Sequence, residues 1–184
     1  YTLTTAFDVS TASFVDAFGV SAQETEPSGL AFNNDGTKMF VLGYAGDDVN
    51  EYTLTTGFDV STASFVDAFS VASQETAPRD LAFNNDGTKM FVVGDFGNDV
   101  NEYTLTTGFD VSTASFVDAF SVASQEGNPS GIAFNNDGTK MFVSGNAGDD
   151  VNEYTLTTGF DVSTASFVDA FSVASQETSP RGLA

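Results

Sequence analysis

The sequence predicts an all-β protein built from tandem repeats, on three observations. The segment YTLTT(A/G)FDVSTASFVDAF begins at Tyr1 and recurs every 51 residues along the 184-residue chain. No stretch of ten residues keeps a helical period of apolar positions without Gly, Pro or β-branched interruption. Hydrophobic residues make up 41% of the chain and include 19 Phe, which predicts a packed core. We therefore expect one array, 1–184, with repeats at 1–51, 52–102, 103–153 and, in part, 154–184.

Four short strands are expected in each repeat. Alternation of apolar and polar residues and β-favouring side chains mark them at Ser64–Val71, Leu81–Asn84, Lys89–Val93 and Val100–Leu105. The third strand follows the second through Asn85-Asp86-Gly87, and Asp-Gly between apolar runs favours a tight turn because Gly accepts a positive φ. A four-stranded antiparallel unit repeated at this period is typical of a β-propeller blade. A β-solenoid is the rival architecture, although its coils are usually shorter.

One segment of the repeat resembles a known family of blades. Pro27 to Val41, PSGLAFNNDGTKMFV, resembles the P-x-G-(I/L)-A-F-x-x-D-G-x-x-(M/L)-(Y/F)-V signature of lactonase-like, YVTN-type and NHL-type propellers. The segment recurs at Pro78, where Asp80 replaces the Gly, at Pro129, and truncated at Pro180. The longer repeat looks like blades of secreted bacterial and phage-associated proteins. The resemblance covers the whole chain and specifies the fold, with little information on function.

The resemblance also implies an order of strands within a blade. It places Gly29–Asn33 as the inner strand A at the central channel, followed by B, C and the outer strand D, at Lys38–Leu42, Val49–Leu54 and Ser64–Val71. Phenylalanines at fixed positions of the repeat are expected to fill the core between neighbouring sheets, where each contributes about 1.5 to 3 kcal/mol. These include Phe58, Phe65, Phe69, Phe83 and Phe91.

The array is expected to be incomplete or open as a single chain. Counted from Tyr1, the strands run C-D, then three rounds of A-B-C-D, then part of A. Unpaired strand edges and an uncovered sheet face promote association. Three outcomes stay open: the chain is an excerpt that continues into more blades, copies complete a ring together, or copies join head to tail into a filament.

Composition limits the classes of partner and reaction. With 26 acidic residues against five basic ones, the net charge is −21, which argues against nucleic acid. No apolar run reaches the length of about 18 residues that spans a bilayer. The chain has no Cys or His, so thiol nucleophiles and imidazole bases are missing. We expect an extracellular or cell-surface location, which the resemblance favours.

The differences between repeats point to a contact surface. The second and third repeats differ at nine positions, all within 76–81 and 93–98 or their equivalents. In a propeller these segments are the D-to-A and B-to-C loops, which emerge on the same face, where ligands usually bind. Drift of unconstrained loops is the simpler explanation. The candidate ligand or partner contacts are Glu26, Tyr44, Arg79, Asp95, Phe96, Asn128, Asn146 and Arg181.

Two weaker possibilities concern metal binding and catalysis. Asp47-Asp48 and Asp149-Asp150 supply hard oxygen ligands of the kind calcium prefers, although solvated turn residues explain them as well. Near-identical blades argue against an asymmetric active site, because catalysis needs unlike residues at one point. The sequence therefore predicts that the chain is not an enzyme, with no cofactor except calcium as a candidate.

Together these features predict a secreted or surface-displayed structural or adhesive propeller protein. Its varied loop face would contact the partner. Copies of the chain would self-associate through unpaired blade edges and join head to tail into filaments. The alternative is a glycan-binding or receptor-binding module of a larger protein, in which Tyr44 and Phe96 would stack on sugar rings. A surface protein is the other candidate partner.

Overall fold

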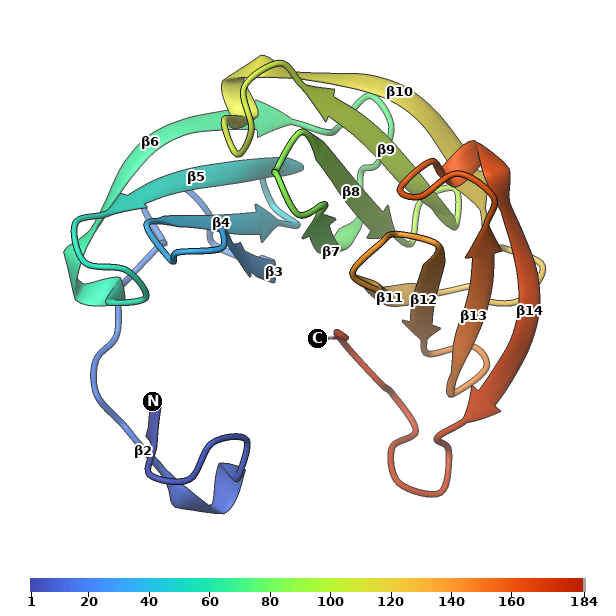
Figure 1. Ribbon diagram of the computed structural model, residues 1–184, viewed down its shortest axis with the longest axis horizontal. Coiled ribbons are helices and arrows are strands. Elements are labelled where there is room, and N and C mark those ends of the chain that lie inside the picture. The colour runs from blue at the N-terminus through green and yellow to red at the C-terminus, as the bar shows by residue number, and fades with distance from the viewer. Residues whose placement is uncertain (184) are drawn as a thin grey trace.

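A computed structural model describes residues 1–183 of the chain. It contains three four-stranded antiparallel sheets that fan around a common centre and leave the ring open on one side (Figure 1). Strands follow one another from the inside of each sheet to the outside. The prediction of an open β-propeller built from blades with a period of 51 residues is confirmed.

Each sheet is one blade, and the three blades have matching bounds. Blade 1 consists of β3 (Pro27–Phe32), β4 (Lys38–Gly43), β5 (Asp48–Leu54) and β6 (Ala63–Ser70). Blade 2 consists of β7 (Pro78–Phe83), β8 (Lys89–Gly94), β9 (Asp99–Leu105) and β10 (Ala114–Ser121). Blade 3 consists of β11 (Pro129–Phe134), β12 (Lys140–Gly145), β13 (Asp150–Leu156) and β14 (Ala165–Ser172).

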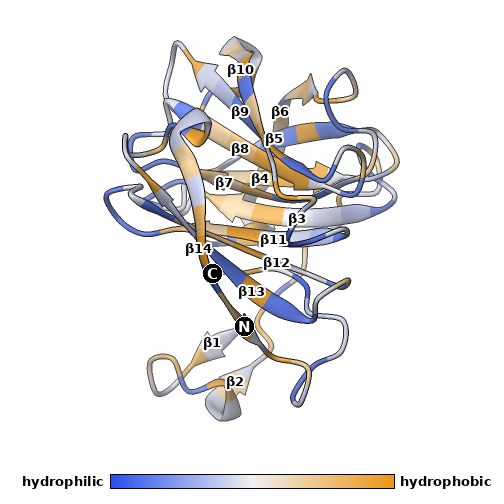
Figure 2. Ribbon diagram, turned by 90° about the vertical axis from the view of Figure 1, so that its right-hand side faces the viewer, coloured by the Kyte–Doolittle hydropathy of each residue, from blue (hydrophilic) through white to orange (hydrophobic). Residues whose placement is uncertain are grey.

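The N-terminal residues form a small hairpin beside blade 1. Strands β1 (Thr2–Leu3) and β2 (Ala12–Ser13) pair with each other and lie apart from the three sheets (Figure 2). Residues 14–26 lead from this hairpin to blade 1, and Phe18 packs edge-on against Tyr52 of β5, with ring centroids 5.6 Å apart. The last described residues lie near the centre of the fan, beside β11, where Gly182 N donates to the carbonyl of Ser130 (Figure 1).

Local chemistry explains the turns between strands. In the turn between β7 and β8, Gly87 has a φ of +70°, and the Asp86 carboxylate accepts hydrogen bonds from the backbone N–H and the hydroxyl of Thr88. Before the outer strand the chain makes a three-residue 3₁₀ turn that the sequence did not predict. Asp110 caps the turn in blade 2 by accepting from the backbone N–H of Ser112. These turns are η1 (Val9–Thr11), η2 (Val60–Thr62), η3 (Val111–Thr113) and η4 (Val162–Thr164).

The core lies between neighbouring blades rather than within one sheet. One cluster joins blade 1 to blade 2 and contains Phe40, Leu42, Met90 and Tyr103 among its buried members. An equivalent cluster joins blade 2 to blade 3. Hydrophobic colouring is strong on inner strands such as β3 and β8, whereas β13 and many of the connecting loops are hydrophilic (Figure 2). No blade therefore buries its apolar face alone, as stacked repeats require.

The expectation that the repeated phenylalanines all fill the core is corrected in part. Phe91 is fully buried, and Phe69 and Phe83 are partly buried against the core between blades 1 and 2. Phe58 and Phe65 are exposed instead. Phe65 lies on β6, the edge strand of its sheet, where its ring packs edge-on against Tyr52 and stays partly open to solvent. Phe58 lies on the side of blade 1 where no complete blade packs.

The described residues contain no helix that could cross a membrane, because the helical turns are three residues each.

Candidate functional site

The varied D-to-A and B-to-C loops lie side by side on one face, as predicted. In each blade they are joined by a backbone hydrogen bond, such as Tyr44 N to the carbonyl of Glu26 at 3.0 Å in blade 1. A buried glutamate holds both loops from behind. The Glu24 carboxylate accepts from the backbone N–H of Glu26 at 2.5 Å and of Gly46 at 3.0 Å. Glu75 and Glu126 occupy the same place in blades 2 and 3.

These loops surround a cavity of about 600 Å³ on that face. Seven of the eight candidate contacts lie in its wall, together with two serines, a proline and a glycine. The lining residues are Glu26, Pro27, Ser28, Tyr44, Arg79, Asp95, Asn128, Ser130, Asn146, Arg181 and Gly182. The wall therefore combines contributions from all three blades and from the C-terminal segment.

Arg79 lies at the centre of the polar contacts in the cavity. Its guanidinium donates from Nε to Asp95 Oδ2 at 2.8 Å and from a terminal nitrogen to the same oxygen at 2.5 Å. The guanidinium carbon also lies 4.8 Å from the centroid of the Tyr44 ring, a cation–π arrangement. Since Tyr44 belongs to blade 1 and Arg79 and Asp95 to blade 2, this group ties two blades together at the cavity.

Asp80, next to Arg79, links the inner strands behind the cavity. Its carboxylate accepts from the backbone N–H of Leu81 at 2.9 Å and of Ile132 at 3.0 Å, and the N–H of Leu183 lies close enough to lower its pKa. Burial raises the pKa of this carboxyl to about 6, although the three N–H groups act in the opposite direction. The side chain therefore joins blade 2 to blade 3 and to the C-terminal segment.

Sequence reasoning did not include Asp80 or Ser130 among the site residues. Ser130 Oγ donates to the carbonyl of Pro180 at 2.6 Å and so helps to place Arg181 in the cavity wall. The signal for Asp80 was its departure from the Gly that the other repeats carry at this position. At the equivalent position of blade 3, a Cβ on Gly131 would lie 2.8 Å from the backbone of Gly182, so a side chain does not fit there.

Phe96 is the one predicted contact outside the cavity wall. It lies in the B-to-C loop of blade 2, its backbone N–H donates to Glu75 at 3.0 Å, and its ring is 59% exposed. The ring is therefore available to a partner that approaches the loops from solvent.

The four aspartates considered as calcium ligands lie at the starts of β5 and β13: Asp48 and Asp150 are the first residues of these strands, and Asp47 and Asp149 precede them. Asp48 and Asp150 each accept from the side-chain amide of an asparagine two residues on, at 2.6 Å. Asp47 and Asp149 have a left-handed backbone, each with a φ of 49°. Within residues 1–183, no three acidic side chains gather as a metal ion would require. Calcium binding stays a prediction without a formed site.

Comparison with protein-family models and with curated protein sequences gives no match. Solved structures do match the fold. A protein from Desulfotomaculum acetoxidans, of unknown function, is 18% identical, with a TM-score of 0.59 over 88% of this chain and 46% of that one. The β-propeller domain of Cps50 (Swd1) from Myceliophteria thermophila is 10% identical, with a TM-score of 0.53 over 80% of this chain and 43% of that one.

A third similar structure is the periplasmic gluconolactonase PpgL of Pseudomonas aeruginosa. It is 18% identical and gives a TM-score of 0.53 over 79% of this chain and 38% of that one. The chain thus spans less than half the length of these three proteins. Identities this low show a shared fold alone, so the expected lactonase-like and propeller character is confirmed for the fold.

The likeness to a lactonase corrects one prediction. We expected no enzyme, on the argument that near-identical blades cannot form an asymmetric site. That exclusion was wrong: a gluconolactonase has this fold, and unlike residues from different repeats do converge on one cavity here. The prediction failed because it considered only the positions that are identical between the repeats. The few positions that differ are the ones that supply unlike residues to the cavity.

Proposed function

We propose that the chain is a secreted or surface-displayed structural or adhesive propeller protein that contacts its partner through the varied loop face. One observation carries the proposal: residues that differ between otherwise matching repeats line a single cavity. Of the nine positions that distinguish the second and third repeats, two place both of their residues in its wall, Arg79 and Ser130, and Asp95 and Asn146. A third position places only Asn128 of the third repeat there.

The chemistry of the wall favours a polar partner. Arg79 and Arg181 are the only arginines of the chain, and both lie in the cavity. Carboxylates, amides and hydroxyls complete the wall, so it offers donors and acceptors for hydrogen bonds in about equal measure. A polar loop of a surface protein or a glycan would match these groups. The net charge of −21 supports solubility outside the cell.

The glycan alternative is favoured by the aromatic residues of the same loops. Arg79 covers one face of Tyr44, whereas the Phe96 ring is exposed and could stack on a sugar. A glycan array probed with the native protein tests this role. We expect Phe96→Ala and Arg79→Ser to abolish binding, and Phe65→Ala, which removes an exposed ring on the outer strand β6, to retain it. Equal binding by all three variants would refute the loop face as the contact surface.

A second part of the proposal is self-association. Blade 3 presents a face on which no further blade of residues 1–183 packs, and Phe171 is exposed there. Copies that add to this face would join head to tail, and they would form filaments unless the joint curves enough to close.

A further inference from the structure

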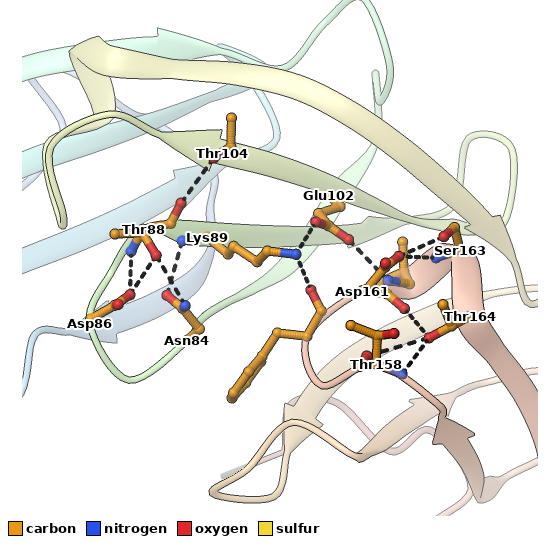
Figure 3. Close-up of polar contacts among 12 residues, drawn as sticks. Asn84, Asp86, Thr88, Lys89, Glu102, Thr104, Thr158, Asp161, Ser163 and Thr164 are labelled. Atoms are coloured by element: carbon orange, nitrogen blue, oxygen red, sulfur yellow. Dashed lines mark hydrogen bonds and ion pairs between the residues drawn. The ribbon is translucent and has the colours of Figure 1, made fainter.

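Each internal junction between blades contains the same ion pair, which holds a loop of the next blade. In blade 2, Lys89 Nζ lies 2.6 Å from Glu102 Oε1 and donates to the carbonyl of Phe160 in blade 3, also at 2.6 Å (Figure 3). Glu102 Oε2 accepts from the backbone N–H of Val162 at 2.9 Å. We call this lysine–glutamate pair with its two backbone contacts the junction clamp.

The clamp is repeated between blades 1 and 2. Lys38 Nζ donates to the carbonyl of Phe109 at 2.6 Å, and Glu51 Oε2 accepts from the backbone N–H of Val111 at 3.0 Å. Next to each clamp an aromatic ring of the outer strand packs on the following blade: Phe69 lies 5.5 Å from Tyr103. The junction clamp and the aromatic contact together therefore determine how each blade packs on the next one.

In blade 3 the lysine–glutamate pair is present, but no loop is bound to it within residues 1–183. Lys140 and Glu153 are paired at 2.5 Å, but within residues 1–183 neither side chain bonds to a following loop. The Glu153 side chain is 29% exposed, against 3% for Glu51 and Glu102. Phe171, the equivalent of Phe69, is 73% exposed. This face has every group needed to receive another blade.

The matching loop is present, unclamped, in the N-terminal segment. Phe7, Asp8 and Val9 repeat the residues that the clamps hold elsewhere, and Val9 is 82% exposed whereas Val111 is fully buried. The loop already has the conformation that a clamp receives. Phe7 has a φ of 61°, against 59° for Phe109, and Asp8 caps the 3₁₀ turn as Asp110 does.

We propose that blade 3 receives the N-terminal segment, residues 1–13, of a second copy of this chain, and that two copies close one ring. In this junction Lys140 Nζ would donate to the carbonyl of Phe7, and Glu153 would accept from the N–H of Val9. The ring of Phe171 would lie against Tyr1, which is exposed and occupies the position of Tyr103 in the repeat. This inference rests on the head-to-tail association in the proposed function. It adds the contacts at the junction and the closure of the assembly as a dimer.

Curvature argues for a closed ring rather than a filament. The three blades match solved propellers as one body, over 38 to 46% of the length of those chains. Each copy therefore supplies nearly half a ring, and a second copy in the same relation returns to the first after two junctions. The loops of the second copy would then complete the open side of the 600 Å³ cavity.

The mass in solution tests the inference. We expect light scattering of the 184-residue chain to give a mass twice that of one copy, which is 19.3 kDa. This measured mass should stay constant when the protein concentration is raised further. Val9→Asp should raise the dissociation constant of the dimer on the order of 100-fold, because a charge would be buried where an apolar side chain belongs. Val66→Asp is the control: Val66 is also exposed, on β6, and the dimer should persist.

Each of the other possible outcomes would refute a different part of the proposal. A species of one chain at all concentrations would refute association itself. Polymers that grow with concentration would refute ring closure and leave head-to-tail association in place. A dimer that Val9→Asp does not weaken would refute the assigned junction. None of these results depends on the partner of the loop face, which the glycan array tests independently.

Discussion

Lys89 and Glu102 form an ion pair on neighbouring strands of blade 2, and together they bind the backbone of a loop in blade 3 (Figure 3). Both Glu102 oxygens are used, one by Lys89 and one by the N–H of Val162. The pair therefore stabilises the contact between blades rather than the sheet in which it lies. The same pair recurs in blade 1, where Lys38 and Glu51 bind the backbone of a loop in blade 2.

Replacement of the lysine should destabilise the array. Lys89→Met leaves the buried Glu102 carboxylate without its cation, and loss of one partner from a buried pair costs about 3 kcal/mol. The free energy of unfolding from urea titration measures this loss. Lys140→Met is the matched control, because its pair is more exposed, and at concentrations where the chain is a monomer it should lose less than about 1 kcal/mol. Equal losses would contradict a role at the junction.

The turn before the second strand of each blade should not tolerate a side chain. Gly87 has a φ of +70°, and an added Cβ would lie 2.3 Å from the ring of Phe109, which itself packs on Phe83. Strain and displacement of the ring should lower the free energy of unfolding by about 2 to 4 kcal/mol in Gly87→Ala. Gly19→Ala meets no atom within 4 Å and should change stability by less than about 0.5 kcal/mol. Thermal or urea unfolding of both variants decides the comparison.

Strands and turns could be predicted because their signals are local and each appears three times. Asp86-Gly87 marks a turn by its own chemistry, and alternation marks β9 without reference to the rest of the chain. The convergence of the varied loops followed from the order of the strands alone. The repeat thus specified the blade and the face on which residues such as Tyr44 and Asn146 lie.

Contacts between blades could not be predicted in the same way. The period shows which positions are equivalent, but it does not show that Lys38 reaches Phe109, 71 residues away. That contact depends on the angle between two packed sheets. For the same reason the exposure of Phe58, and the position of Phe96 outside the cavity wall, emerged only from the structure.

Asp80 should control the C-terminal segment. Its carboxylate accepts from the N–H of Ile132 and lies close to the N–H of Leu183, and Asp80→Gly, which introduces the residue of the other repeats, removes the carboxylate from both. We expect faster hydrogen exchange at Leu183 and faster tryptic cleavage after Arg181, at least tenfold for a loss of about 1.4 kcal/mol or more. Asp16→Gly removes an exposed carboxylate whose one recorded bond is to Ala17, and cleavage should not change. Unchanged cleavage in Asp80→Gly would contradict the anchoring role.

Glu75 makes the stability of blade 2 depend on pH. Burial raises the pKa of its carboxyl to about 7, and the nearby charges of Asp99 and Asp95 act in the same direction. The unfolded chain releases this proton near 4.5, so between these values the folded chain holds a proton that the unfolded chain has lost. The contribution of Glu75 to the free energy of unfolding is therefore greatest below pH 4.5. It falls by about 3 kcal/mol as the pH rises past 7. Asp80, with a pKa of about 6, adds a smaller fall of the same sign.

Glu75→Gln should remove most of this pH dependence. The amide oxygen can still accept from Ala77 and Phe96, and the amide nitrogen replaces Glu75 Oε2, which has no hydrogen-bond partner in the structure. Above pH 7 the variant should exceed the native chain in stability by about 2 kcal/mol. In blade 3 the equivalent oxygen of Glu126 accepts from the N–H of Gly148, so Glu126→Gln should instead lose about 1 to 2 kcal/mol. The difference arises in the turn, since Gly97 in blade 2 has a φ of +81° and its N–H does not bond to the carboxylate. Urea titrations at pH 5 and pH 8 compare the two variants, and an equal loss in both at pH 5 would show that Glu75 is charged in the folded protein at that pH, against its raised pKa.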